Sequence, residues 1–214
     1  MRFRAYLSGF LFLACVAAAG FRFVTPLNRA KHSNDQNRSE SREIQQYKYK
    51  EYHNERFNFS FEYPQGWEIN EAVDGGGVTV GPKLGPYLQY SPTIGVRVAE
   101  VGVRQDGTPR TLEEDYETSL GSLKKYRLDE THHVSNVKVV KKESTTFQGL
   151  PAIFRKVTFN VDGQSWVDEG IMLHGKDEHY SFGVALICSS QQLPSFQPVY
   201  DEAVRTFQFL EPLK

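Results

Sequence analysis

Hydrophobic and polar residues alternate most regularly between Leu150 and Cys188, and this pattern predicts three consecutive strands. In the first strand, Ile153 and Phe159 share one face with other apolar residues. Asp162-Gly163 then fits a two-residue hairpin turn, because glycine adopts a positive φ without steric cost. Neither face of the second and third strands is cleanly polar, so we expect helices to cover the sheet on both sides.

Three more stretches show the same alternation before this region. From Phe57 to Ile69, aromatic residues alternate with polar ones around a turn at Pro64-Gln65-Gly66, which predicts a strand, a turn and a second strand. The stretch Ile94 to Val103 predicts a strand with either a bulge or a two-sided environment, because its apolar phase switches between Val98 and Val101. The stretch Val134 to Phe147 predicts another strand, which leads through Gly149 into the three already described.

Two stretches have helical periodicity instead. Thr111 and Glu114 form the sequence signature of a capping box, and apolar residues follow at helical spacing up to Leu123. Near the end of the chain, we expect Ser195 to cap a helix whose apolar stripe would cover one face of the sheet. Pro198 is expected in its first turn, where a missing N–H is tolerated. The stripe consists of Phe196, Val199, Tyr200, Ala203, Val204 and Phe207.

Residues 1–24 resemble an export signal or a membrane anchor. A short basic start precedes an apolar run, and Ala17-Ala18-Ala19 fits a cleavage site before Gly20. Two alternatives to cleavage remain open. The run could be retained as an anchor, although it is short for a spanning helix, or Cys15 could be lipidated, although Phe12 departs from the usual motif. The sequence therefore predicts an extracytoplasmic protein, periplasmic, secreted or lumenal, that the N-terminal segment could tether to a membrane.

Residues 25–56 are rich in Asn, Gln, Ser and charged residues, and we interpret them as a flexible linker. Tyr47, Tyr49 and Tyr52 near its end could pack onto the following domain or start a helix. Residues 57–214 are expected to form a single domain. They hold 15 basic and 21 acidic residues, a net charge of −6, which makes nucleic acid a poor partner.

Motifs that would indicate an enzyme are absent from the sequence. It has no nucleophile elbow, no His-Glu-x-x-His, no Cys-x-x-Cys and no phosphate-binding loop. Cys188 is expected to be an inert core residue, because it ends an apolar strand. Asp168 and Glu169 are neighbours in a strand and point to opposite faces, which argues against a catalytic pair of carboxylates.

Two clusters contain residue types that bind divalent metal ions, although no cofactor is required by the sequence. His174, Asp177, Glu178 and His179 surround one hairpin turn, and imidazole and carboxylate groups are common metal ligands. A second such cluster contains Asp129, Glu130, His132 and His133. Turns are commonly built from the same residue types, so both clusters also have a purely structural interpretation.

The segment Gly81 to Pro92 is the candidate contact surface for a protein partner. It is interrupted by Gly-Pro and Ser-Pro steps, and loops of this length inside a compact domain are often functional. Leu84, Tyr87 and Tyr90 are the residues expected to contact the partner, although they could instead pack over the sheet.

The order of these elements resembles the PsbP-like superfamily, which includes photosystem II PsbP proteins and bacterial DcrB-type envelope lipoproteins. The resemblance rests on Phe-x-Phe-x-Tyr-Pro-x-x-Trp at residues 59–67, Gly-x-Pro-Ala at residues 149–152 and the final Thr206-Phe207-Gln208-Phe209. It covers residues 57–210. It implies an α+β fold, an α/β/α sandwich with a central antiparallel sheet.

The resemblance also implies a function without catalysis. Members of this superfamily generally act as extrinsic, assembly or envelope proteins at a membrane face. We therefore expect a non-enzymatic binding, scaffold or assembly protein with an unidentified protein partner. Alternatives are a metal-binding envelope protein or, in a photosynthetic source, an extrinsic protein associated with photosystem II.

Overall fold

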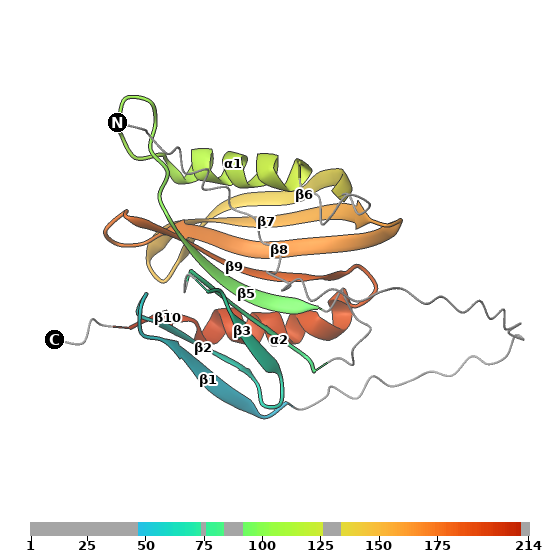
Figure 1. The fold of residues 1–214 in the computed structure, drawn as a ribbon. Helices are drawn as coiled ribbons and strands as arrows, with labels where there is room; N and C mark the ends of the chain where they lie inside the picture. Colours follow the sequence, from blue (N-terminus) through green and yellow to red (C-terminus); the bar gives the residue numbers. More distant parts are fainter. Residues whose placement is uncertain (1–46, 74–75, 84–91, 126–133, 211–214) are drawn as a thin grey trace, which may run out of the picture.

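The structure is a computed structural model that describes residues 47–73, 76–83, 92–125 and 134–210 (Figure 1). Its centre is a seven-stranded sheet in which all neighbouring strands are antiparallel. In spatial order the strands are β3 (Glu68–Glu71), β4 (Gly77–Gly81), β5 (Thr93–Glu100), β9 (Tyr180–Ser189), β8 (Gln164–His174), β7 (Leu150–Val161) and β6 (Val134–Phe147).

The three strands predicted between Leu150 and Cys188 are confirmed as β7, β8 and β9. Asp162 and Gly163 have φ values of 51° and 77° and form the expected tight turn between β7 and β8. Gln148 and Gly149, with φ values of 52° and 77°, make a matching turn between β6 and β7. These turns join β6, β7 and β8 into one continuous meander.

Helix α1 (Leu112–Lys124) covers one face of this sheet, over β6, β7 and β8 (Figure 1). The capping box is confirmed, because the Thr111 hydroxyl accepts from the Glu114 N–H and the Glu114 carboxylate accepts from the Thr111 N–H. Apolar side chains fill the space between helix and sheet. They are Tyr116, Leu120, Leu123, Val134, Ile153, Val157, Phe159, Val161, Trp166 and Met172.

Helix α2 (Leu193–Thr206) lies on the opposite face beside a second, three-stranded sheet (Figure 1). This sheet has the order β1 (Tyr49–Asn54), β2 (Phe59–Pro64) and β10 (Gln208–Phe209). Phe59, Phe61 and Phe207 are almost fully buried in the core between this layer and the large sheet. The expected cover on both faces is therefore confirmed, and one covering layer contains strands as well as a helix.

The start of α2 differs from the prediction. The helix is capped at Gln192 and not at Ser195, and Gln192 makes no side-chain cap because its Oε1 accepts from the Ser189 hydroxyl at 2.8 Å. Pro194 lies in the first turn, where proline is tolerated. Pro198 therefore lies inside the helix and not in the first turn.

The folded unit begins before the expected boundary at Phe57. Tyr49–Asn54 form β1, which pairs with β2, so these residues belong to the domain and not to a flexible linker. Tyr52 is buried, and Tyr47 and Tyr49 pack against the same core, as one interpretation expected. Tyr49 and Tyr52 lie in a strand, Tyr47 lies just before it, and no helix starts in this described stretch. Local composition concealed this strand, because its stability comes from pairing with β2 and from one buried face.

The remaining features of the fold are the end of β5, the length of the described helices and the fold class. The strand predicted from Ile94 to Val103 ends at Glu100, and Val103 forms an isolated bridge with Pro109. Its register with β9 is unbroken from Thr93 to Glu100, so the strand has no bulge there, and residues of both phases are buried, as in a two-sided environment. Among the residues that the structure describes, no helix is long and apolar enough to cross a membrane. The α+β class with a central antiparallel sheet is confirmed.

Candidate functional site

A buried ion pair lies between α1 and the sheet. The Arg155 guanidinium on β7 donates to the Asp168 carboxylate on β8 at 2.6 Å and to the Ser119 hydroxyl on α1 at 3.0 Å. The side chains of Arg155 and Asp168 are only 6% and 3% exposed. Burial raises the pKa of Asp168, and the nearby Arg155 opposes part of this effect. The pair therefore connects the helix to two adjacent strands.

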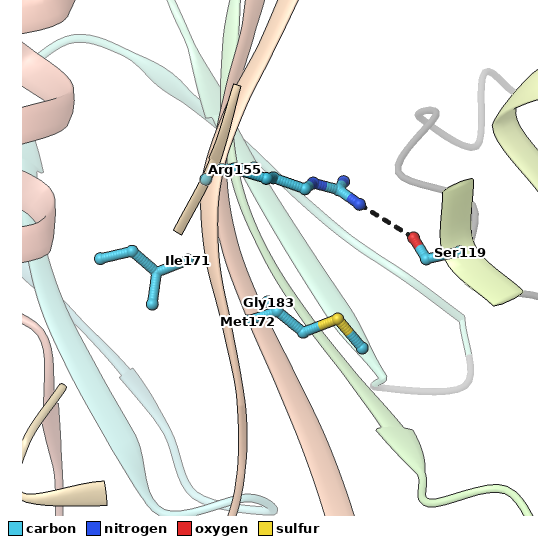
Figure 2. A pocket seen from close by; sticks show the side chains of 7 residues that line it. Ser119, Arg155, Ile171, Met172 and Gly183 are labelled. Carbon is cyan, nitrogen blue, oxygen red and sulfur yellow. Dashed lines mark hydrogen bonds between the residues drawn. The ribbon is translucent and has the colours of Figure 1, made fainter. Parts of the chain in front are cut away.

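A small cavity adjoins this ion pair (Figure 2). Figure 2 shows Arg155 and Met172 projecting toward the α1 side of the sheet, where the guanidinium meets Ser119, whereas Ile171 projects to the other side. The volume of the cavity is about 10 Å³, which is roughly the space that one water molecule needs. The cavity is therefore too small for an organic substrate, and its polar groups serve to attach α1.

Close packing of the strands limits this cavity. A Cβ added to Gly170 would lie 2.7 Å from the Cβ of Ala185 and 2.8 Å from the carbonyl oxygen of Val184. Real Cβ atoms do not come this close to other atoms, so only glycine fits at position 170. Gly170 and its partner Ala185 therefore allow β8 and β9 to approach closely at this pair.

A second buried carboxylate, Asp115, anchors the first turn of α1. Its Oδ2 lies 3.1 Å from His174 Nε2 at the end of β8, and its Oδ1 lies 3.8 Å from Arg110 Nη1. Asp115 is 1% exposed. Arg110 also donates to the Thr118 hydroxyl at 3.2 Å. His174 is thus used to hold the helix against the end of the sheet.

The metal cluster predicted at His174, Asp177, Glu178 and His179 is not assembled. In the described part of the chain, no three His, Cys, Asp or Glu side chains lie close enough to hold a metal ion. His174 faces Asp115, whereas Asp177 accepts from the His179 N–H at 3.1 Å and the His179 ring packs on Tyr180. The carboxylate of Asp177 is used by the turn itself, as is common for Asp in turns.

The other candidates lie outside the described residues or are confirmed as core. Leu84, Tyr87 and Tyr90 fall in 84–91, and Asp129, Glu130, His132 and His133 fall in 126–133, which the structure does not describe. Cys188 is fully buried, and burial raises the pKa of its thiol to about 11. The expected core position of Cys188 is therefore confirmed.

Asp168 and Glu169 point to opposite faces, as predicted. Asp168 contacts Arg155 below α1, whereas Glu169 lies 2.7 Å from Lys156 Nζ and accepts from Gln197 of α2 at 3.0 Å. The sequence interpretation missed the partner of Asp168. Arg155 follows Ile153 on the core face of β7, and a charge in that phase was the available signal of a buried pair.

The outer edge of the large sheet is the main exposed feature of the described chain. β6 is the last strand of the seven, and among the strands that the structure describes it pairs with β7 alone. Eleven of its 14 residues are exposed, including Val139 at 42% and Val140 at 59%. An unpaired strand edge offers backbone N–H and C=O groups to a further strand. β6 is therefore the candidate binding surface of the described domain.

Comparison with known proteins gives likeness in structure alone. No family model and no curated protein matches the chain. CyanoP, the PsbP protein of the cyanobacterium Synechocystis, matches with a TM-score of 0.52 and 11% identity, over 78% of this chain and 95% of CyanoP. The Ran-binding protein Mog1p of Saccharomyces cerevisiae matches with a TM-score of 0.52 and 10% identity, over 78% of this chain and 97% of Mog1p.

A third match comes from a bacterial envelope protein. LpqN, involved in cell envelope biogenesis of Mycobacterium tuberculosis, matches with a TM-score of 0.51 and 9% identity, over 72% of this chain and 83% of LpqN. At such low identities the likeness concerns the fold. This chain has a Mog1/PsbP-like fold, and the resemblance stated from its sequence is confirmed at that level.

Proposed function

We propose that this protein is an exported, non-enzymatic binding protein that assembles with a protein partner at the extracytoplasmic face of a membrane. The observation that carries the proposal is the exposed edge strand β6. A strand that pairs on one side only can bind an extended segment of a partner through its backbone, a recurring mode of protein recognition. The buried side chains of Arg155 and Asp115, by contrast, are engaged in contacts between α1 and the sheet.

The proteins of similar fold support this proposal. Mog1p is named as a Ran-binding protein, and LpqN is involved in cell envelope biogenesis. Residues 1–24 have the features of an export signal or anchor, which supports placement outside the cytoplasm. In a photosynthetic source, the likeness to CyanoP favours photosystem II as the assembly, and co-purification with that complex would test this narrower function.

Site-specific photo-cross-linking of the full chain in its native envelope tests the binding function. A photoreactive phenylalanine analogue at Thr145, which is exposed on β6, is expected to form a discrete protein adduct. The matched control carries the same analogue at Asn70, which is exposed on β3 at the opposite edge of the sheet. Equal adducts at both positions, or none at Thr145, would remove β6 as the binding surface.

A further inference from the structure

The two halves of β6 differ in regularity. In the first half, Asn136 has a φ of 52°, and the register with β7 shifts between Ser135 and Lys138 and again between Val139 and Lys141. Such irregularities disrupt a sheet edge and discourage further pairing. From Lys141 to Phe147 the register is unbroken, with seven consecutive partners on β7. Only this second half offers a regular edge.

The charged side chains at the start of this regular edge are bound within their own domain. Lys142 contacts Glu113 and Glu117 of α1, the second at 3.3 Å. Lys141 lies 2.9 Å from Glu143 and 5.0 Å from the ring centroid of Phe154. Lysine on an edge strand normally opposes pairing with another strand. Here the lysine charges are compensated locally, so the protection is weakened.

We propose that the strand paired with this edge is β6 of a second copy of this chain. The inference rests on the proposed function and names its partner. In a symmetric dimer the two strands run antiparallel about a two-fold axis. An axis through Ser144 uses all seven regular residues of both copies. The opposing pairs are then Lys141 with Phe147, Lys142 with Thr146, Glu143 with Thr145 and Ser144 with itself.

Charge and the number of paired residues select this register over its neighbours. An axis through Thr145 would pair only residues 143–147 of the regular edge. An axis through Lys142 places the two copies of Lys142 opposite each other and moves the irregular residue Val140 into the pairing. An axis through Glu143 opposes two carboxylates. Like charges directly opposite each other destabilise a strand pair. The axis through Ser144 avoids both conflicts and pairs all seven residues of the regular edge.

Cysteine cross-linking of the full chain tests this arrangement. In a Cys15→Ser background, in which Cys188 remains buried, we introduce Ser144→Cys and treat the membrane-bound or detergent-solubilised protein with a short bis-maleimide. Most chains are expected to run at twice the mass of a single chain. The control Asn70→Cys, exposed on the opposite edge, is expected to remain at the mass of one chain. Equal cross-linking of the two variants would overturn the proposal.

Two substitutions at Thr145 test the register, because they should change the dissociation constant of the dimer in opposite directions. Thr145→Glu places a second carboxylate opposite Glu143 of the other copy, whereas Thr145→Lys places a cation there. Each pair occurs twice in the dimer, so we expect dissociation constants at least about twofold higher for Thr145→Glu and twofold lower for Thr145→Lys. Thr145 is exposed on the edge strand, so neither substitution is expected to affect folding. Changes of the same sign in both variants would contradict the register.

The outcomes separate this inference from the function on which it rests. If Ser144→Cys stays at the mass of one chain while the Thr145 photo-cross-linker captures a different protein, the second copy is excluded and the binding function stands. If neither probe forms an adduct, both proposals fall.

Discussion

Removing the Asp168 carboxylate tests whether the buried ion pair holds α1 on the sheet. Asp168→Ala leaves the Arg155 guanidinium, whose side chain is 6% exposed, without its carboxylate partner at 2.6 Å. Removing one partner of a buried pair costs about 3–5 kcal/mol. Since domains of this kind are stable by only about 5–15 kcal/mol, the variant should lose a large part of its free energy of unfolding.

The assay is urea unfolding followed by tryptophan fluorescence. Trp67→Phe leaves Trp166, which is buried in the core below α1, as the single reporter. Glu202→Ala serves as a control, because the Glu202–Arg205 pair lies on the surface, where such pairs contribute about 0–1 kcal/mol. A loss for Asp168→Ala no larger than that of Glu202→Ala would refute the reasoning.

A double variant distinguishes the contribution of the charges of the ion pair from the contribution of side-chain packing. Arg155→Met combined with Asp168→Leu removes both charges of this pair, and replacing a buried ion pair by apolar residues of similar volume is often neutral or stabilising. We expect the double variant to regain most of the stability lost by Asp168→Ala. Failure to regain it would mean that Arg155 and Asp168 contribute through packing and not through charge.

Three further predictions concern other parts of the domain. Gly170→Ala should cost about 1–3 kcal/mol in urea unfolding because of its contacts with Ala185, whereas Gly121→Ala, with open space around it in α1, should stabilise by about 0.4–1 kcal/mol. Hydrogen bonds from Arg104 and the Thr111 N–H lower the pKa of Glu114 from 4.5 to about 2. The stabilisation of the fold by ionised Glu114 is therefore present above pH 4.5 and lost as the pH falls toward 2. Glu114→Gln should flatten that part of the curve of unfolding free energy against pH. Because its pKa is raised to about 11, Cys188 should resist iodoacetamide at pH 8 in the folded chain and react after unfolding, as read by mass spectrometry; rapid reaction in the folded chain would contradict its burial.

Elements with a local cause could be predicted from the sequence. The Asp162-Gly163 turn follows from the preference of Gly for positive φ, and the start of α1 follows from reciprocal bonds within four residues, Thr111 to Glu114. Elements with a distant cause could not. β1 has a polar composition, and its residues become a strand because β2, which is held by the core, lies beside them.

The candidate site shows the same division. Hairpin proximity suggested that His174 and His179 could share a metal ion, but strand direction decides where each ring points, and His174 faces Asp115 on a helix 59 residues earlier in the chain. The Arg155–Asp168 contact joins residues 13 apart on neighbouring strands. The phase of Arg155 in β7 was visible in the sequence, whereas the choice of Ser119 as its helix partner depends on how α1 docks.

The edge position of β6 could not be predicted from the sequence either. The sequence predicted a strand from Val134 to Phe147, and this strand is confirmed. Its position at the end of the sheet depends on strand order, which puts β9 beside β5 and leaves nothing beyond β6 in the described sheet. An edge position is a property of topology, and the alternation of side chains does not encode it.

Amide hydrogen exchange of β6 tests the central claim most directly. Every second residue of an edge strand directs its N–H away from the sheet, where it exchanges readily until another strand pairs with it. In the full chain within its native assembly, we expect the outward amides between Lys141 and Phe147 to exchange more slowly than in the dissociated, dilute protein, with no such change on β3. Equal exchange of these amides in the two states would contradict binding through β6.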